Sequence, residues 1–216
     1  MKKLILINTV KPVVATFEDK IREKMPNIEI SNILDEFIAK NLNKKEGFEE
    51  EDYSRLLTLI KLAEDTKPDA ILATCSSLSM AIDYLKPMIS VPIYKIDEAM
   101  LNQAVDSGKK ITVLATADST IGPTETQLHR IAKSKGKTIE VEHKVFGPAY
   151  EAMKRGEGKV HDMLVLTGAS ELKNVELIVL AQASMGHLEE EMRRLCKCEV
   201  LGSPRLAVDL IVEKLS

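Results

Sequence analysis

The sequence is poor in several residue types that mark particular classes of protein. It has no tryptophan, only 4% aromatic residues, and three cysteines, an odd number. Three cysteines do not suggest a disulfide framework and favour a reducing compartment, so we expect a cytoplasmic protein. The 30 basic and 33 acidic side chains nearly balance. Without a strong positive field, nucleic acid is not expected as a ligand.

Long hydrophobic runs and metal-binding patterns are also missing. The apolar runs 71–74 and 177–181 are too short to cross a bilayer, so no membrane partner is expected. The run 4–7 near the start is too short for a signal peptide and predicts a first strand. The four histidines show no paired ligand spacing, and no metal site is predicted.

Short aliphatic and β-branched runs alternate with helical segments along the chain. In the segment 51–65, Leu56 and Ile60 belong to an apolar stripe with the helical period. Strands separated by helices pair in parallel, and the apolar strands 70–73 and 177–180 indicate sheets covered on both faces. The pattern predicts an α/β fold of doubly wound, Rossmann-like units. The predicted strands are 3–8, 28–33, 70–74, 92–96, 111–116, 138–145, 177–181 and 199–201.

Three segments of the first half of the chain match the second half at one common shift of 107 residues. The shift lays 71–77 on 178–184, 4–9 on 111–116, and 91–94 on 198–201. Any α/β protein offers similar strands at similar intervals, but a common ungapped register favours internal duplication. We therefore predict two pseudo-symmetric parallel-sheet lobes, 1–96 with 203–216 and 97–202, which enclose one cleft.

Polar loops follow the predicted strands at the edge where parallel α/β units bind ligands. The loops are short and rich in hydroxyl groups, and each leads into a helix. Free N–H groups at helix N-termini and Ser or Thr side chains bind carboxylates and phosphates, so we expect a small anionic ligand, a carboxylic acid. The candidate binding residues are Asn8, Thr9, Thr74, Ser76, Ser77, Thr116, Ser119, Thr120, Gln182, Ala183 and Ser184.

Seven segments carry a family resemblance, in order along almost the whole chain. They are Leu6-Ile7-Asn8-Thr9, the segment 70–77, Val91-Pro92-Ile93, the segment 113–120, Pro123-Thr124, His161-Asp162 and Gly202-Ser203-Pro204. Together they resemble the cofactor-independent aspartate/glutamate racemase superfamily, which includes hydantoin racemases, maleate isomerases and arylmalonate decarboxylases. The resemblance implies two pseudo-symmetric halves, a small carboxylate or amino-acid substrate and no cofactor. Homodimers are common among such proteins.

The resemblance also implies a mechanism with two cysteines, one at each of two repeat-related strand ends. One thiolate removes the α-proton of the substrate, and the opposite thiol delivers a proton to the other face. Free cysteine has a pKa of about 8.5, so thiol and thiolate are both accessible near neutrality. Hydroxyl and N–H groups would stabilise the enediolate that develops on the carboxylate.

This sequence departs from that pattern at the second cysteine. Cys75 occupies the first position, but Gln182 stands at the second, and an amide exchanges no proton at neutral pH. Cys196 and Cys198 precede the strand 199–201 and are expected near its amino end, away from the ligand. His187, five residues after Gln182, is a substitute acid or a solvated helix residue.

The other candidate residues also have a structural interpretation beside the functional one. Cys75 is the acid/base or a small core residue. Gln182 is a substrate-binding amide or the relic of a lost catalytic site. Adjacent helical residues do not face one another, so His161 and Asp162 are expected to be structural rather than a catalytic dyad. Three hydroxyl residues bind the carboxylate or cap a helix that begins near Pro123, namely Thr116, Ser119 and Thr120.

Two classes of function therefore remain open. The first is a racemase-like isomerase that uses Cys75 as acid/base at the α-carbon of a small carboxylic acid, or a single-cysteine decarboxylase or lyase. The second is a non-catalytic protein that binds small carboxylates. The sequence does not name the substrate, because side-chain selectivity depends on loop geometry.

Overall fold

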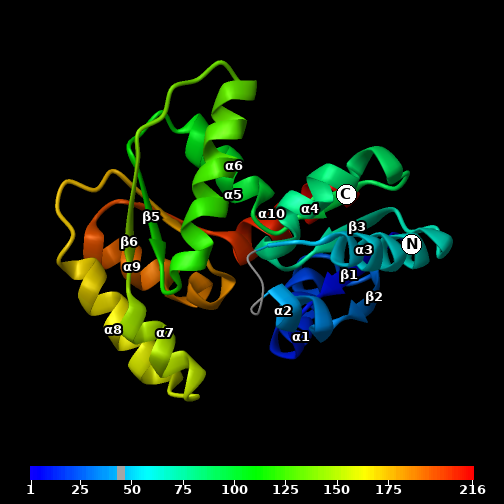
Figure 1. Ribbon diagram of the computed structural model, residues 1–216, viewed down its shortest axis with the longest axis horizontal. Coiled ribbons are helices and arrows are strands. Elements are labelled where there is room, and N and C mark those ends of the chain that lie inside the picture. Colours follow the sequence, from blue (N-terminus) through cyan, green and yellow to red (C-terminus); the bar gives the residue numbers. More distant parts are fainter. Residues whose placement is uncertain (43–46) are drawn as a thin grey trace. The chain divides into compact units, whose positions relative to one another are not determined.

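The computed structural model describes residues 1–42 and 47–216 (Figure 1). The chain divides into two compact units. Unit 1 comprises Met1–Asp97 with Ala207–Ser216, and unit 2 comprises Glu98–Leu206. Each unit is built on one four-stranded parallel sheet with flanking helices, which confirms the predicted α/β class.

Unit 1 has the strand order β2-β1-β3-β4, with all neighbours parallel. The strands are β1 (Lys3–Asn8), β2 (Glu29–Leu34), β3 (Ala70–Ala73) and β4 (Ile93–Lys95). The helices are α1 (Lys11–Lys24), α2 (Glu36–Leu42), α3 (Glu50–Asp65), α4 (Ser79–Leu85) and the 3₁₀ turns η1 (Ser76–Leu78) and η2 (Lys86–Met88). The helix α10 (Ser203–Leu215) belongs to unit 1 from Ala207 onward.

Unit 2 repeats this order as β6-β5-β7-β8. Its strands are β5 (Ile111–Ala115), β6 (Val141–Val145), β7 (Leu177–Leu180) and β8 (Glu199–Gly202). Its helices are α5 (Glu98–Asp106), α6 (Ile121–Ser134), α7 (Gly147–Lys154), α8 (Gly158–Ser170), α9 (Glu189–Cys196) and the turns η3 (Asp118–Thr120) and η4 (Ala183–Leu188). All eight predicted strands are present, although the one predicted over 138–145 begins at Val141.

Strand pairing in the two units follows the shift of 107 residues seen in the sequence. Leu4 pairs with Ala70 in unit 1, and the shifted residues Ile111 and Leu177 pair in unit 2. The pairs Ile71–Ile93 and Ile178–Val200 have the same relation. The strands β2 and β6 do not follow the shift, because Leu4 pairs with Ile30 whereas Ile111 pairs with Val141. The ungapped repeat therefore covers three strands of each sheet.

The central strands form the core of each unit. Every residue of β3 and of β7 is buried, as expected for parallel strands covered by helices on both faces. In unit 1, the helix α3 buries Leu56, Ile60 and Ala63, a stripe of helical period. No helix among the described residues is long and apolar enough to cross a membrane.

A buried carboxylate lies just beyond β4 in unit 1. Asp97 is 5% exposed, and Ser79 Oγ donates a hydrogen bond of 2.7 Å to its Oδ1. Burial raises the pKa of Asp97 to about 6, although the Ser79 hydrogen bond and the charge of Lys95 act in the opposite direction. Folded Asp97 therefore holds a proton over a pH range in which the unfolded chain has lost it.

The pH dependence of stability tests this assignment. Between about pH 4 and pH 6 the folded state binds more protons than the unfolded state, so stability decreases as the pH rises through this window. Over this window the titration of Asp97 lowers the free energy of unfolding by roughly 2–3 kcal/mol. Asp97→Asn carries no proton to lose. In urea unfolding it should be more stable than the native protein at pH 8, and its stability should not fall between pH 4 and pH 6. An equal difference between variant and native protein at pH 5 and pH 8 would contradict the assignment.

Candidate functional site

In unit 1 the predicted binding residues gather where β1 and β3 end. Thr74 Oγ1 donates a hydrogen bond of 2.7 Å to Asn8 Oδ1, and both residues are buried. Asn8 Nδ2 donates to Asn32 Oδ1 on β2 at 3.1 Å. These contacts fix the Asn8 amide within the unit. Asn32 was not predicted from the sequence; it lies on β2, whose residues are all exposed or half-buried.

Thr9 follows Asn8 and has an unsatisfied hydroxyl group. The residue is 1% exposed, and among the described residues its Oγ1 has no hydrogen-bond partner. A buried polar group without a partner costs free energy, and buried hydroxyl groups in proteins are normally bonded. The Thr9 hydroxyl is therefore suited to a ligand oxygen.

Cys75 lies at the end of β3, the strand next to β1. Its backbone is extended, with φ −130° and ψ 122°, and it directly precedes the turn η1. The side chain packs partly against the core of unit 1, and its Sγ lies 2.9 Å from Ser77 Oγ. The residue is half-buried, as is Ser76, whereas Ser77 is exposed. The thiol is thus at the surface of the unit rather than enclosed in its core.

In unit 2 the corresponding position belongs to Gln182, at the end of β7. Its backbone is also extended, with φ −126° and ψ 133°. Gln182 Oε1 accepts hydrogen bonds from Thr116 N at 2.6 Å, Thr116 Oγ1 at 3.0 Å and Ala117 N at 3.2 Å. The predicted residues Thr116 and Gln182 are therefore brought together, through a direct contact that the sequence did not reveal.

The remaining predicted residues of unit 2 lie around this contact. Thr120 Oγ1 donates to Ala117 O at 2.8 Å, and the helix α6 begins at Ile121 rather than near Pro123, without a side-chain cap. Ser119 and Ser184 are exposed, and Ala183 is half-buried. The hydroxyl of Thr116 therefore contacts Gln182 instead of capping the helix.

His161 and Asp162 do face one another, unlike the sequence-based expectation, although nothing in this contact contradicts a structural role. Asp162 Oδ1 lies 2.8 Å from His161 Nδ1, and Asp162 Oδ2 lies 2.9 Å from His187 Nε2. The Asp162 carboxylate, in the second turn of α8, therefore bridges two imidazoles, one of them its neighbour in the helix. Burial raises the pKa of Asp162, but the hydrogen bonds from His187 and His161 outweigh it and lower the pKa overall. His161 is fully buried, and its Nε2 has no partner among the described residues.

The other two thiols lie at the end of α9 and just before β8, near the amino end of that strand as expected from the sequence. Both pack against the core of unit 2, and Cys196 Sγ lies 3.5 Å from Ala169 O. Burial raises the pKa of Cys196, and burial together with the charge of Cys196 raises the pKa of Cys198 to about 11. Both are thiols rather than thiolates at neutral pH, which makes them poor bases.

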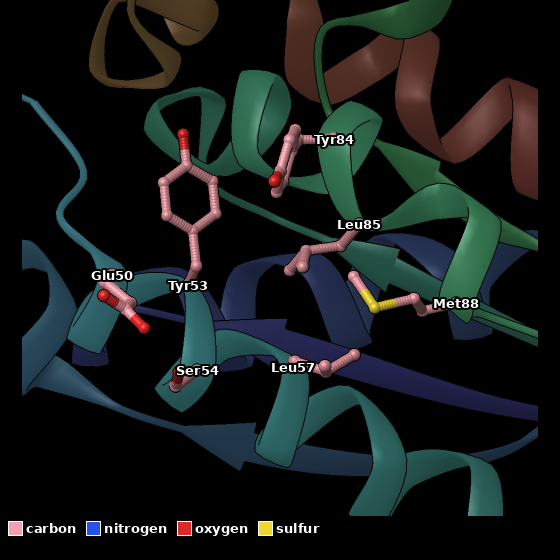
Figure 2. A pocket seen from close by; sticks show the side chains of 7 residues that line it. All are labelled: Glu50, Tyr53, Ser54, Leu57, Tyr84, Leu85 and Met88. Carbon is pink, nitrogen blue, oxygen red and sulfur yellow. The ribbon is translucent and has the colours of Figure 1, made fainter.

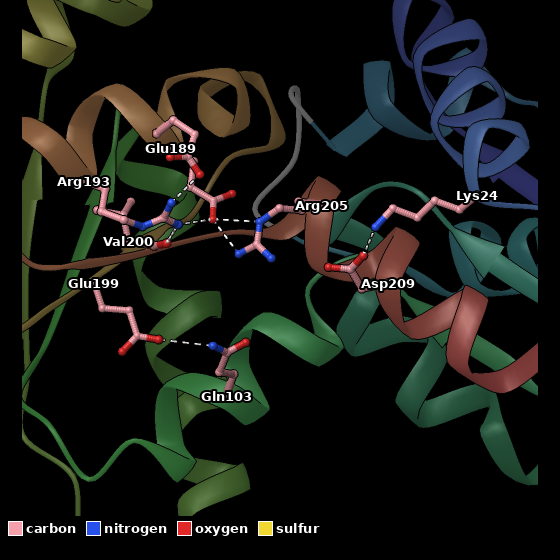
Figure 3. A network of polar contacts seen from close by, with 9 residues as sticks. Lys24, Gln103, Glu189, Arg193, Glu199, Val200, Arg205 and Asp209 are labelled. Carbon is pink, nitrogen blue, oxygen red and sulfur yellow. Dashed lines mark hydrogen bonds and ion pairs between the residues drawn. The ribbon is translucent and has the colours of Figure 1, made fainter.

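A network of ion pairs that was not predicted from the sequence surrounds Glu189 at the start of α9 (Figure 3). Glu189, whose side chain is 5% exposed, accepts from Arg193 Nη2 at 2.8 Å and from Arg205 Nη2 at 2.6 Å. Arg193 Nη2 also donates to Val200 O on β8 at 3.0 Å. A Cβ on Gly202 would come within 2.8 Å of Glu189 Oε2, so a larger residue there would displace the Glu189 carboxylate. These contacts join α9 to β8 and to the first turn of α10.

Unit 1 has a separate hollow of about 480 Å³ between α3 and α4 (Figure 2). The rings of Tyr53 and Tyr84 lie side by side in it, with centroids 5.1 Å apart, and Glu50 is the one charged residue of its lining. None of the predicted site residues lines this hollow. Among the described residues, its mainly apolar lining contains no thiol or imidazole for acid/base chemistry. The remaining lining residues are Ser54, Leu57, Leu85 and Met88.

Solved structures of several racemases are similar in fold to this chain. The glutamate racemase of Francisella tularensis, solved with D-glutamate, is 14% identical, with a TM-score of 0.71 over 98% of this chain and 80% of that one. Picrophilus torridus aspartate racemase is 14% identical, with a TM-score of 0.70 over 99% and 95% of the two chains. Allantoin racemase from Klebsiella pneumoniae is 18% identical, with a TM-score of 0.66 over 100% and 87%. These similarities show a shared racemase fold.

The family is established by sequence. The model of the Asp/Glu/hydantoin racemase family matches residues 11–211. A comparison with curated proteins finds no match. The chain belongs to the Asp/Glu/hydantoin racemase family, which confirms the resemblance seen in its motifs.

Proposed function

We propose that the protein is a racemase-like isomerase that acts on the α-carbon of a small carboxylic acid, with Cys75 as acid/base. The observation that carries this proposal is that two groups follow the ends of the neighbouring strands β1 and β3. A half-buried thiol follows β3, and a buried hydroxyl without a partner, that of Thr9, follows β1. Membership of a racemase family supports the same chemistry.

The expected reaction begins when the Cys75 thiolate removes the α-proton. The electron pair of the broken C–H bond moves into the carboxylate, which becomes an enediolate. Hydroxyl and N–H donors at the strand ends stabilise this charge. In many enzymes such donors make the largest contribution to stabilising the transition state. The Ser77 hydroxyl, 2.9 Å from the sulfur, stabilises the thiolate by a charge-assisted hydrogen bond. Return of the proton from Cys75 to the same face restores the substrate.

Inversion requires a second acid, and Gln182 does not supply one. Its amide has no proton to exchange near neutrality, and its oxygen is engaged by Thr116 and Ala117. His187 is the substitute acid for which an observation exists, since Asp162 holds its Nε2 at 2.9 Å. A carboxylate that orients an imidazole in this way is a familiar arrangement in acid/base catalysis.

Incubation with each enantiomer of aspartate and glutamate in heavy water tests the proposal. We expect deuterium to enter the α-position of one enantiomer faster than its chirality is lost, because Cys75 serves one face. Deuterium content and chirality are measured in the same samples, with allantoin and a malonate as further substrates. Loss of CO₂ from the malonate would favour the decarboxylase alternative.

Two other outcomes separate the alternatives. Fast inversion of both enantiomers would contradict one-face chemistry, and His187→Asn would then be expected to restore it. Carboxylate binding without exchange of any substrate would contradict catalysis and favour the binding protein. Asp118→Asn is the control variant for His187→Asn in the exchange experiment and should behave as the native protein does. Its side chain is exposed and close in sequence to Thr116, but it has no proposed role.

A further inference from the structure

Three hydrogen-bond donors of unit 2 converge on one oxygen of the protein itself. The backbone N–H groups of Thr116 and Ala117 and the Thr116 hydroxyl all point at Gln182 Oε1, at 2.6–3.2 Å. We call these three donors the Thr116 cradle. Backbone and hydroxyl donors arranged in this way form an environment suited to an anionic oxygen. Here a neutral amide oxygen occupies that place.

The contacts also fix the orientation of the Gln182 amide. If its oxygen and nitrogen were exchanged, the NH₂ group would face three donors, which is unfavourable. The carbonyl therefore points into the cradle and the NH₂ points away from it. Gln182 as a whole is half-buried.

The shift of 107 residues identifies the counterpart of this cradle in unit 1. It relates Thr9 and Val10 to Thr116 and Ala117. Both second residues are extended, with φ −137° and ψ 131° at Val10 and φ −117° and ψ 129° at Ala117. Both threonines are buried, being 1% and 2% exposed. We call the donors of Thr9 and Val10 the Thr9 cradle.

The two cradles differ in what fills them. The residue that corresponds to Gln182 in unit 1 is Cys75, whose sulfur contacts Ser77. The hydroxyl of Thr9 consequently lacks the partner that the hydroxyl of Thr116 has, and it remains buried without one among the described residues. By comparison with Gln182 Oε1 in unit 2, the Thr9 cradle lacks an oxygen that accepts hydrogen bonds.

We propose that Gln182 is a specificity-determining residue that closes the Thr116 cradle to anions. It does so as an internal ligand, and the carboxylate oxygen of an external ligand is left to the Thr9 cradle of unit 1. The identity of that carboxylate as the substrate rests on the proposed function. The closure of the Thr116 cradle does not rest on it, because it follows from contacts within unit 2.

Acetate binding to the full-length protein tests the closure. In the native protein, titration with acetate should shift the ¹H–¹⁵N signals of Thr9 and Val10 and leave those of Thr116 and Ala117 unchanged. In Gln182→Ala the oxygen that fills the cradle is removed. Acetate should then shift Thr116 and Ala117 as well, with an affinity at that cradle at least about tenfold higher than in the native protein.

Matched variants separate closure from a general change of shape. Gln182→Glu keeps a side-chain oxygen at the same reach, so its cradle should stay unresponsive to acetate. Gln182→Asn, one methylene shorter, should respond as Gln182→Ala does, and it serves if the alanine variant fails to fold. Thr116→Val combined with Gln182→Ala should lose most of the gained affinity.

Two results would overturn the inference. One is an acetate response of Thr116 and Ala117 in the native protein equal to that in Gln182→Ala. The other is a folded Gln182→Ala protein whose cradle binds no acetate. Failure of the proposed function is distinguishable from these, since a protein without isotope exchange would still show the acetate pattern.

Discussion

Cys75→Ala should lower the rate of α-proton exchange roughly a thousandfold, which is within the range of a single general acid/base. Alanine leaves no group at the end of β3 that can accept the substrate proton, while the hydroxyl groups around it remain. Carboxylate binding should therefore change much less than turnover. Deuterium incorporation from heavy water measures the first quantity, and acetate titration measures the second.

The other thiols provide the controls for this experiment. Cys196→Ala and Cys198→Ala remove thiols whose pKa values are raised by burial, so exchange should remain within about twofold of the native rate. Cys75→Ser replaces the thiol by a far weaker acid and should resemble Cys75→Ala. Full exchange activity in Cys75→Ala would show that the cysteine only packs against the core of unit 1.

Glu189→Ala should be the most destabilising single change to the ion-pair network of unit 2. It removes a buried carboxylate and leaves the guanidinium groups of Arg193 and Arg205 without this partner. Breaking a buried ion pair costs about 3–5 kcal/mol. We expect about 3 kcal/mol, because the arginine side chains are 35% and 43% exposed and gain water in return. Urea unfolding followed by circular dichroism measures the loss.

Glu190 is a matched control next to Glu189 in the same helix. It also pairs with Arg193, but its side chain is 77% exposed. An exposed ion pair contributes at most about 1 kcal/mol, so Glu190→Ala should be nearly neutral. Glu189→Gln keeps the shape and one hydrogen-bond acceptor and should be intermediate. Equal losses for Glu189→Ala and Glu190→Ala would contradict a buried, cooperative network.

The sequence by itself determined the strands, the repeat and the position of the key residues along the chain. Buried parallel strands are continuous apolar runs, and helical crossovers separate them at regular intervals. The strands can therefore be recognised from short segments of sequence. The same logic predicted that the loops 8–9 and 74–77 lie at one edge of a sheet, and Thr74 does contact Asn8.

Only the tertiary structure decided which polar groups contact one another. Thr116 and Gln182 are 66 residues apart, and their contact depends on a side-chain conformation that no spacing specifies. The Asp162 bridge to His161 and His187 was not predicted, because adjacent residues of a helix were not expected to face one another. Hydrophobic periodicity is a property of a segment, whereas a hydrogen bond depends on the distance and angle between two particular atoms. The fold could therefore be predicted from the sequence, but the cradle closed by Gln182 and the unsatisfied hydroxyl of Thr9 could not.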